Sequence, residues 1–500
     1  MRLPLDQNRS PIVEALRHHV RRGYQRFHVP GHKGWRKAPP GLRMLSGDAV
    51  AAMDLTEVGD LDDLQRPEGV IGEAQALAAA AFGADESFFL VNGVTAGIHA
   101  SIAACASGGR VLVPRNAHRS VVGALILAGA EPVWVMPEYD SSTGVAGGVA
   151  AAEVEARIAS GPPVSAGVLV HPTYHGITGD TSEVVQLLHA RGVPVIADEA
   201  HGAHFYFGRG FPATALACGS DAGIAGCHKT AGAFTQGAVL NVRGRLVDVE
   251  RLRAWLRVVQ TTSPSYILMA SIDSARQLMA TRGREHLSEA LDLAEDARRR
   301  ISERTAFTCP GDEWTGRPGF RGLDRAKLTV ITGGAGLDGR TVARTLQDEH
   351  GIMVEFAQPQ GILAIVTYAD DPAGVRRLVA ALEVISRRAP RGNGGIVQPE
   401  LPRIPAQAMP PRRAFLSRSQ WTDLETARGR VAADIVAVYP PGIPVLCPGE
   451  IVEDRVVEYV RQSCLGGYHV HGVARCGESG SDENCGGRGY RIMVRVVCDS

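Results

Sequence analysis

The 500-residue sequence has no net charge, because 53 Lys and Arg residues balance 53 Asp and Glu residues. A neutral chain has no overall attraction for nucleic acid or for an anionic membrane, so neither is expected as a partner. The sequence also lacks an apolar run long enough to span a bilayer. Its start, Met1 to Asn8, has no continuous apolar core and is not expected to be a secretory signal. The expected location is therefore the cytoplasm.

Cysteine is sparse and poorly spaced for metal binding. The chain has nine cysteines and no Cys-x-x-Cys pair, so no zinc site is expected. A disulfide is disfavoured in a reducing compartment. Four of the nine cluster near the end of the chain, and their role stays open: Cys464, Cys476, Cys485 and Cys498.

Apolar strand-like runs alternate with helix-like stretches from about residue 70 to 245. This alternation predicts an α/β fold with a mostly parallel, doubly wound sheet covered on both faces. The expected strands include residues 110–114, 132–136, 166–170 and 194–198. The expected helices include residues 72–82, 95–106, 120–128 and 182–191.

The pattern divides the chain into five expected segments. Residues 11–27 have helical spacing and belong to an N-terminal arm, and residues 284–304 have a second helical pattern. Residues 388–413 are rich in Pro, Arg and Gly, which is typical of a linker. The expected segments are an arm (1–40), a large α/β domain (41–285), a small α/β domain (286–390), a linker (391–413) and a C-terminal domain (414–500).

The run Pro194-Val-Ile-Ala-Asp198 is an apolar strand that ends in a carboxylate. Ligands of open α/β sheets bind at the carboxyl ends of strands, so Asp198 is a candidate catalytic group. Capping of the next element is the structural alternative. The following residues, through His201 and His204, also suggest a metal site, but the spacing and the intervening Gly202 disfavour a helix that carries both imidazoles.

Lys229 comes thirty-one residues after Asp198 and follows another apolar stretch, residues 222–225. A lysine among Gly, Ala, Cys and Phe is a candidate nucleophile, because desolvation lowers the pKa of an amine. A lysine that closes an exposed turn is the alternative. Lys33 is the rival candidate, although no strand precedes it.

Two further patterns fit a phosphorylated aromatic cofactor. Gly93, Val94 and Thr95 open an expected helix, whose backbone N–H groups and Thr hydroxyl suit a phosphate. His118 follows the strand that ends at Pro114, where an imidazole can stack on a ring, although it can equally be an ordinary loop residue. A phosphate turn, a stacking ring, a carboxylate and an amine are together what pyridoxal 5'-phosphate (PLP) requires.

The chain resembles the Orn/Lys/Arg decarboxylases of the aspartate-aminotransferase fold (fold type I), and most of all the shorter bacterial arginine or lysine decarboxylases. The resemblance covers nearly the whole chain. The motifs that carry it are Phe27-His-Val-Pro-Gly-His-Lys33, Asp54-Leu-Thr-Glu57, Leu61-Asp-Asp-Leu64, Phe88-Phe-Leu-Val-Asn-Gly93, His171-Pro-Thr-Tyr-His-Gly176, Asp198-Glu-Ala-His-Gly-Ala-His204, His228-Lys229, Thr262-Ser-Pro-Ser-Tyr266, Tyr439-Pro-Pro-Gly-Ile-Pro444 and Pro448-Gly-Glu450.

The resemblance implies a role for each candidate residue. Lys229 would form the Schiff base with PLP, and Asp198 would pair with the pyridine nitrogen. Ala200 would pack under the ring and His118 over it, while Gly93, Val94 and Thr95 would hold the phosphate. His201 would lie near the substrate carboxylate and His228 near the phosphate. Thr262 and Ser263 would approach the site across the interface of a homodimer or a higher homo-oligomer.

Two sites in the sequence depart from the family pattern, the pair before His228-Lys229 and the position before Thr95. Gly226 and Cys227 stand where a Ser or Thr usually precedes the His-Lys pair, and Val94 stands where a hydroxyl residue is common. Each change removes a phosphate contact that the resemblance would otherwise imply.

The implied reaction is decarboxylation of arginine, lysine or ornithine, with arginine favoured, to give CO2 and an amine for polyamine biosynthesis. The acidic residues from Asp54 to Asp63 could meet the basic end of the substrate, or they could form a solvated turn. The motifs do not decide which bond at Cα breaks. An aminotransferase or an oxidative deaminase acting on a basic amino acid is therefore the alternative, and a silent binding protein is a third possibility that Asp198 and Lys229 disfavour.

Overall fold

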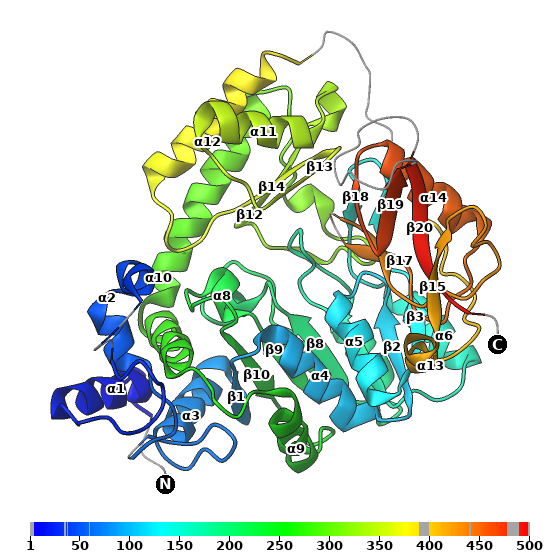
Figure 1. The fold of residues 1–500 in the computed structure, drawn as a ribbon. Helices are drawn as coiled ribbons and strands as arrows, with labels where there is room; N and C mark the ends of the chain where they lie inside the picture. Colours follow the sequence, from blue (N-terminus) through cyan, green and yellow to red (C-terminus); the bar gives the residue numbers. More distant parts are fainter. Residues whose placement is uncertain are drawn as a thin grey trace. The chain divides into compact units, whose positions relative to one another are not determined.

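The computed structural model of the protein describes residues 5–34, 37, 39–59, 61–389, 400–439, 442–477 and 490–498 (Figure 1). The chain divides into two units, each assembled from several segments. The first unit comprises Met1–Cys105, Leu188–Asp292 and Thr367–Ala369, and the second comprises Ala106–Leu187, Leu293–Val366 and Asp370–Ser500.

Four strands of the first unit lie in the order β1-β10-β9-β8. The last two, β8 and β9, are parallel, with Asp198 opposite Ile224. By contrast, β10 is antiparallel to both β9 and β1. Every residue of β8, β9 and β10 is buried, which explains their continuous apolar runs. The strands are β1 (Glu86–Leu90), β8 (Val195–Glu199), β9 (Ala222–Ala225) and β10 (Ala238–Val242).

The helix that follows β1 packs closely on this part of the sheet. A Cβ atom on Gly97 would lie 2.8 Å from side-chain carbons of both Ile224 and Leu90, so only glycine lets the helix approach this far. The helices of this unit are α1 (Pro11–Arg22), α2 (Pro40–Met53), α3 (Val70–Phe82), α4 (Gly93–Ala106), α8 (Cys227–Thr230) and α9 (Val249–Val259), with the 3-10 turn η1 (Ala203–Tyr206).

Two helices differ from the predicted ranges. The first, α1, ends before the predicted residue 27, because Gly23 adopts the left-handed conformation (φ 63°) that terminates helices. Helix α10 (Tyr266–Arg304) begins well before the predicted residue 284 and passes from the first unit into the second. Its early residues Tyr266, Met269 and Ile272 are fully buried, so this part lacks the polar face by which a surface helix is recognised.

The second unit contains three parallel strands in the order β6-β2-β3, again alternating with helices. Its elements here are β2 (Arg110–Pro114), α5 (Arg119–Ala128), β3 (Glu131–Val135), β4 (Tyr139–Asp140), β5 (Val145–Ala146), α6 (Ala151–Ser160), β6 (Ala166–Val170) and β7 (Ile177–Thr178). Helix α7 (Thr181–His189) begins in this unit, and its last two residues belong to the first unit. The parallel strands and alternating helices of the two units confirm the predicted α/β class.

Smaller sheets complete the second unit (Figure 1). A three-stranded sheet, β12-β14-β13, comes first in the chain, and two more, β15-β20-β19 and β17-β16-β18, follow after residue 400. The elements are η2 (Asp312–Trp314), β11 (Gly322–Leu323), β12 (Lys327–Ile331), η3 (Gly333–Ala335), α11 (Gly339–His350), β13 (Phe356–Gln358), β14 (Gly361–Ile365), α12 (Pro372–Ser386), α13 (Pro411–Leu416), β15 (Ser419–Asp423), β16 (Val436–Tyr439), β17 (Ile443–Leu446), α14 (Asp454–Leu465), β18 (His469–His471), β19 (Val473–Gly477) and β20 (Tyr490–Val497).

The five-segment division stays a prediction, and residues 391–399 of the expected linker lie outside the described residues. So does Cys485 of the tail. In the described ranges, no helix is both long and apolar enough to cross a membrane.

The close approach at Gly97 predicts a specific loss of stability. Gly97→Val should destabilise the protein by roughly 1–3 kcal/mol, because the added carbons must displace Ile224 and Leu90. The urea midpoint of unfolding measures this. Gly41→Ala is the control, since its Cβ would meet nothing within 4 Å. Equal midpoints for the two variants would contradict the packing described.

Candidate functional site

Lys229 and His201 lie together at the carboxyl ends of two neighbouring strands. Helix α8, which carries Lys229, begins two residues after β9 ends, and His201 follows β8 just as closely. The Lys229 Nζ is 3.0 Å from the His201 Nε2. His201 is 6% exposed and Lys229 is half-buried. The structure thus joins two predicted catalytic residues in one hydrogen-bonded pair.

Asp198 is the next-to-last residue of β8 and is 5% exposed. Its Oδ1 accepts a hydrogen bond from the backbone N–H of Ala200 at 3.0 Å. Among the described residues, no Lys, Arg or His side chain forms an ion pair with this carboxylate. A buried carboxylate without a cation is costly, so the site suits a ligand that brings a protonated nitrogen. The ring nitrogen of the predicted PLP cofactor is such a group.

His228 sits beside Lys229 in α8 and is half-buried. Its Nδ1 lies 3.1 Å from the carbonyl oxygen of Gly237, so Nδ1 carries the proton and donates it. Burial lowers the pKa of His228, and the nearby Lys229 lowers it further, against the opposing effect of the Gly237 hydrogen bond. The ring is therefore neutral near pH 7, and its Nε2 carries a lone pair that can accept a hydrogen bond.

The departure at Gly226 has a packing reason. A Cβ atom on Gly226 would lie 2.4 Å from the carbonyl oxygen of Ala200, so no hydroxyl residue fits there. Cys227 is 3% exposed, and its Sγ lies 3.9 Å from the carbonyl oxygen of Ala225. Burial raises the pKa of this thiol to about 12, so it stays neutral.

The predicted phosphate turn lies at the start of α4. Gly93 adopts a left-handed conformation (φ 73°) as the first residue of the helix, and Val94 and Thr95 complete the first turn. The N–H groups of a first helical turn have no partner within the helix, and Thr95 is exposed to solvent. Phosphate binding here stays a prediction.

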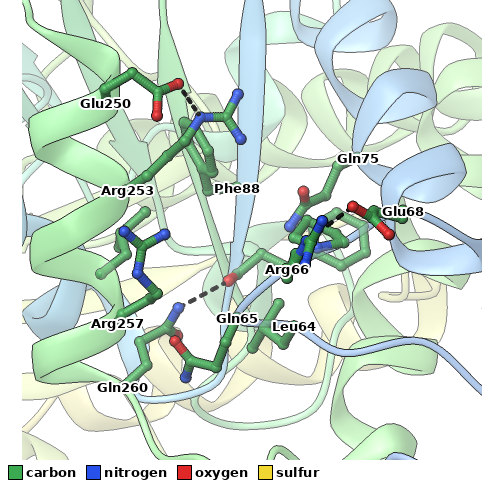
Figure 2. Close-up of a pocket in the computed structure, with 13 residues that line it drawn as sticks. Leu64, Gln65, Arg66, Glu68, Gln75, Phe88, Glu250, Arg253, Arg257 and Gln260 are labelled. Atoms are coloured by element: carbon green, nitrogen blue, oxygen red, sulfur yellow. Dashed lines mark hydrogen bonds and ion pairs between the residues drawn. The ribbon is translucent and has the colours of Figure 1, made fainter.

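Gln260, which the sequence reading missed, ties the Thr262 segment to the strand before this turn. Its Oε1 accepts from Val91 N at 2.9 Å, and its Nε2 donates to Phe89 O at 3.3 Å. Gln260 also lines a polar hollow of about 280 Å³ between α9 and residues 64–68 (Figure 2). No local pattern in the sequence marks Gln260, because its partners Val91 and Phe89 lie far away along the chain. Thr262 and Ser263 themselves are exposed, and their approach to a partner's site stays a prediction.

His118 belongs to the second unit, where it precedes α5. Its side chain is exposed, and its Nδ1 accepts a hydrogen bond from Ser120 N at 3.2 Å. The imidazole therefore caps the helix, and its stacking on a cofactor ring stays a prediction.

Glu199 is a second residue that the sequence reading missed. It is fully buried, and because strand residues alternate, it points to the opposite face from Asp198. Tyr206 Oη donates to its Oε2, and Ala215 N donates to its Oε1 at 2.8 Å. Burial raises the pKa of Glu199 to about 7, with Asp198 adding to the rise and the two hydrogen bonds opposing it. Glu199 thus holds the end of β8 through hydrogen bonds on the face opposite Asp198.

Several other candidate residues make structural contacts. The Oδ2 of Asp62 accepts from the backbone N–H groups of Gly69, Ile71 and Gly72 and so caps α3, which favours the turn interpretation for that residue. Lys33 donates to His28 O within its own loop. His204 packs edge-on against Phe211. Asp60 lies outside the described residues.

Comparison with known proteins gives two family matches that together span most of the chain. Residues 10–373 match the model of the Orn/Lys/Arg decarboxylase major domain, and residues 398–497 match that of the Orn/Lys/Arg decarboxylase C-terminal domain. The chain is 37% identical to an arginine decarboxylase of Bacillus anthracis over 94% of this chain and 96% of that protein. It is 36% identical to the arginine decarboxylase of Bacillus subtilis over the same shares.

More distant relatives share the fold. The constitutive lysine decarboxylase of Escherichia coli is 25% identical over 94% of this chain and 79% of that protein. The crystal structure of the Francisella novicida lysine decarboxylase superposes with a TM-score of 0.83 at 21% identity, over 98% of this chain and 81% of the other. The ureidoglycine-glyoxylate aminotransferase of Bacillus subtilis gives a TM-score of 0.52 at 16% identity, over 65% of this chain and 87% of the other. The predicted type I fold is therefore confirmed.

The raised pKa of Glu199 predicts a pH-dependent stability. Between pH 4.5 and 7 the folded protein keeps a proton that the unfolded chain releases, so stability should fall as pH rises through this window. Glu199→Gln, which keeps an acceptor for Ala215 N, should flatten the profile by roughly 3 kcal/mol. Urea unfolding between pH 5 and pH 8 measures it.

The matched control is Glu155→Gln, which removes an exposed carboxylate from α6. That variant should keep the wild-type pH profile. A Glu199→Gln profile as steep as the wild type would show that Glu199 is not the group that titrates.

Proposed function

The chain belongs to the Orn/Lys/Arg decarboxylase family, and on that premise we propose that it decarboxylates arginine with PLP held by Lys229 and Asp198. Decarboxylation of a basic amino acid is the activity of this enzyme. The observation that carries the finer assignment is the Lys229–His201 pair at the carboxyl ends of two parallel strands, with buried Asp198 beside it in sequence.

Arginine is the preferred substrate in this proposal. The two arginine decarboxylases of Bacillus are 36–37% identical to the chain, whereas the lysine decarboxylase of Escherichia coli is 25% identical. Both arginine decarboxylases are also aligned over 96% of their own length. The difference in identity supports arginine over lysine.

The residues of the site match the needs of the cofactor. When bound, PLP supplies an electron sink for the pair released as the bond between Cα and the carboxylate breaks. Asp198 would keep the ring nitrogen protonated, and the amine of Lys229 would hold the cofactor by its aldehyde. Gly93, Val94 and Thr95 would hold the phosphate at the start of a helix, while Ala200 and His118 would pack against the ring. His228 would lie near the phosphate, beside Lys229.

In this proposal, the hydrogen-bonded pair of Lys229 and His201 transfers the protons. The 3.0 Å separation of the Lys229 Nζ from the His201 Nε2 lets a proton pass between them. Either group can then return a proton to Cα after CO2 has left. Because His201 is nearly buried, this exchange is sheltered from bulk water.

The alternative is an aminotransferase or oxidative deaminase acting on a basic amino acid. It would use the same Lys229 and Asp198 but remove the proton of Cα first. The two reactions differ in product, since one gives CO2 and an amine and the other a keto acid.

The wider setting is also proposed. We infer that the enzyme works in the cytoplasm as a homodimer or larger homo-oligomer, in which exposed Thr262 and Ser263 approach the partner's site. The amine product would enter polyamine biosynthesis.

An assay with three substrates tests the proposal. PLP-loaded protein should release CO2 and the matching amine from arginine, and less or none from lysine and ornithine. Lys229→Ala should lower the rate on the order of 10³-fold or more, because it removes the amine that binds the cofactor. Absorbance of the bound cofactor and product analysis are the measurements.

Lys33→Ala is the matched lysine control and should retain the cofactor absorbance. Absence of CO2 with all three substrates would refute the decarboxylase, and a keto-acid product would favour the alternative.

A further inference from the structure

We propose that the C-terminal domain positions His118, and that the buried ion pair between Arg115 and Glu450 is the means. The C-terminal domain is here the region matched by the second family model, residues 398–497. This inference rests on the proposed packing of His118 on the cofactor ring. It makes Arg115 and Glu450 positioning residues of the site, although neither is assigned contact with cofactor or substrate.

The ion pair is geometrically complete. The two terminal nitrogens of Arg115 donate to Glu450 Oε1 at 2.5 Å and Oε2 at 2.7 Å, and its Nε donates to Pro444 O at 2.8 Å. Cys447 N also donates to Glu450 Oε2 at 2.7 Å. The two side chains are 3% and 0% exposed. Both partners are thus held in one orientation, away from screening water.

Arg115 begins the short loop that presents His118. The loop runs from Arg115 to His118, between the end of β2 at Pro114 and the start of α5 at Arg119. Asn116 Nδ2 donates to Gly147 O at 3.0 Å, and Ala117 N donates to Pro114 O at 3.0 Å. The loop is short and each of its residues is hydrogen-bonded, so we expect a change in the orientation of Arg115 to alter the placement of His118.

The far end of α5 touches the same domain. Helix α13 packs against α5, and the two lie side by side in Figure 1. The guanidinium of Arg412 reaches Leu127 O near the end of α5 at 3.5 Å. The C-terminal domain therefore contacts the segment formed by the loop and α5 at both ends, and the buried ion pair lies at the end that carries His118.

The chemistry of the pair favours a positioning role over simple stabilisation. A buried ion pair pays desolvation for both charges, and well-packed apolar side chains often give equal or greater stability. Its distinctive property is geometric, because a planar guanidinium and a carboxylate meet in one fixed, two-point arrangement. Such a fixed arrangement suits a loop whose imidazole, that of His118, is proposed to lie flat on the cofactor ring.

A double-mutant cycle in the full-length chain tests the inference. Glu450→Gln and His118→Ala should each weaken PLP binding by roughly 3- to 10-fold, the value of a lost ring contact. The double variant should bind no more weakly than His118→Ala alone, because both changes remove the same contact. PLP titration of the apoprotein gives the dissociation constants, and both single variants should shift the absorbance maximum of bound PLP in the same direction.

Asp273→Asn is the matched control, since it also removes the charge of a buried carboxylate bonded to an arginine. The Asp273–Arg276 pair is 2.6 Å apart, its side chains are 0% and 1% exposed, and it lies in the first unit. This variant should lose thermal stability as Glu450→Gln does, yet keep the wild-type PLP affinity and absorbance maximum.

Two results would overturn the inference. Additive losses in the cycle would mean that Glu450 acts independently of His118. Unchanged PLP affinity in His118→Ala would remove both this inference and the proposed role of His118, while the role of Lys229 is judged separately by Lys229→Ala. If Glu450→Gln does not fold, Arg115→Lys replaces it in the same cycle, because it keeps the charge but loses the two-point geometry.

Discussion

The parallel pairing of β8 with β9 is the constraint on which the candidate site depends. Parallel strands end at the same edge of a sheet, so whatever follows each strand must meet there. Asp198 lies near the end of β8 and His201 follows that strand, whereas Lys229 follows β9. With Asp198 opposite Ile224 in the register of the two strands, the Lys229 Nζ lies 3.0 Å from the His201 Nε2. Lys229 lies thirty-one positions after Asp198 in the sequence, yet the parallel pairing places the ends of their two strands at the same edge of the sheet.

The alternation of strand residues gives the end of β8 two functions. Asp198 points to the face where we propose that the protonated ring nitrogen binds, and Glu199 points to the other face, where Tyr206 and Ala215 N donate hydrogen bonds to it. The close packing around this edge also explains the departure from the family at Gly226, because the Ala200 carbonyl leaves no space for a side chain. At this edge of the sheet, the groups proposed to bind the cofactor lie directly beside closely packed backbone.

In the second unit, a side chain is oriented by residues that are distant in sequence. Its parallel strands place Arg115 at the end of β2, but the orientation of that side chain is set by Pro444 and Glu450, far away in sequence. A domain that carries none of the candidate cofactor groups thereby constrains the loop before α5. This offers a physical reason for the major and C-terminal domains to share one chain.

The sequence by itself determined the α/β class, strands such as 110–114 and 166–170, and the candidacy of Asp198 and Lys229, because these depend on local hydrophobic patterning and on motifs that follow strands. It also identified the family. Only the tertiary structure decided the roles of Glu199, Gln260 and Arg115, since each depends on a partner that folding brings near and no local pattern announces. Tyr206, Phe89 and Glu450 are those partners, and burial makes their hydrogen bonds obligatory. The buried start of α10 escaped prediction for the same reason, because its neighbours rather than its own periodicity determine its environment.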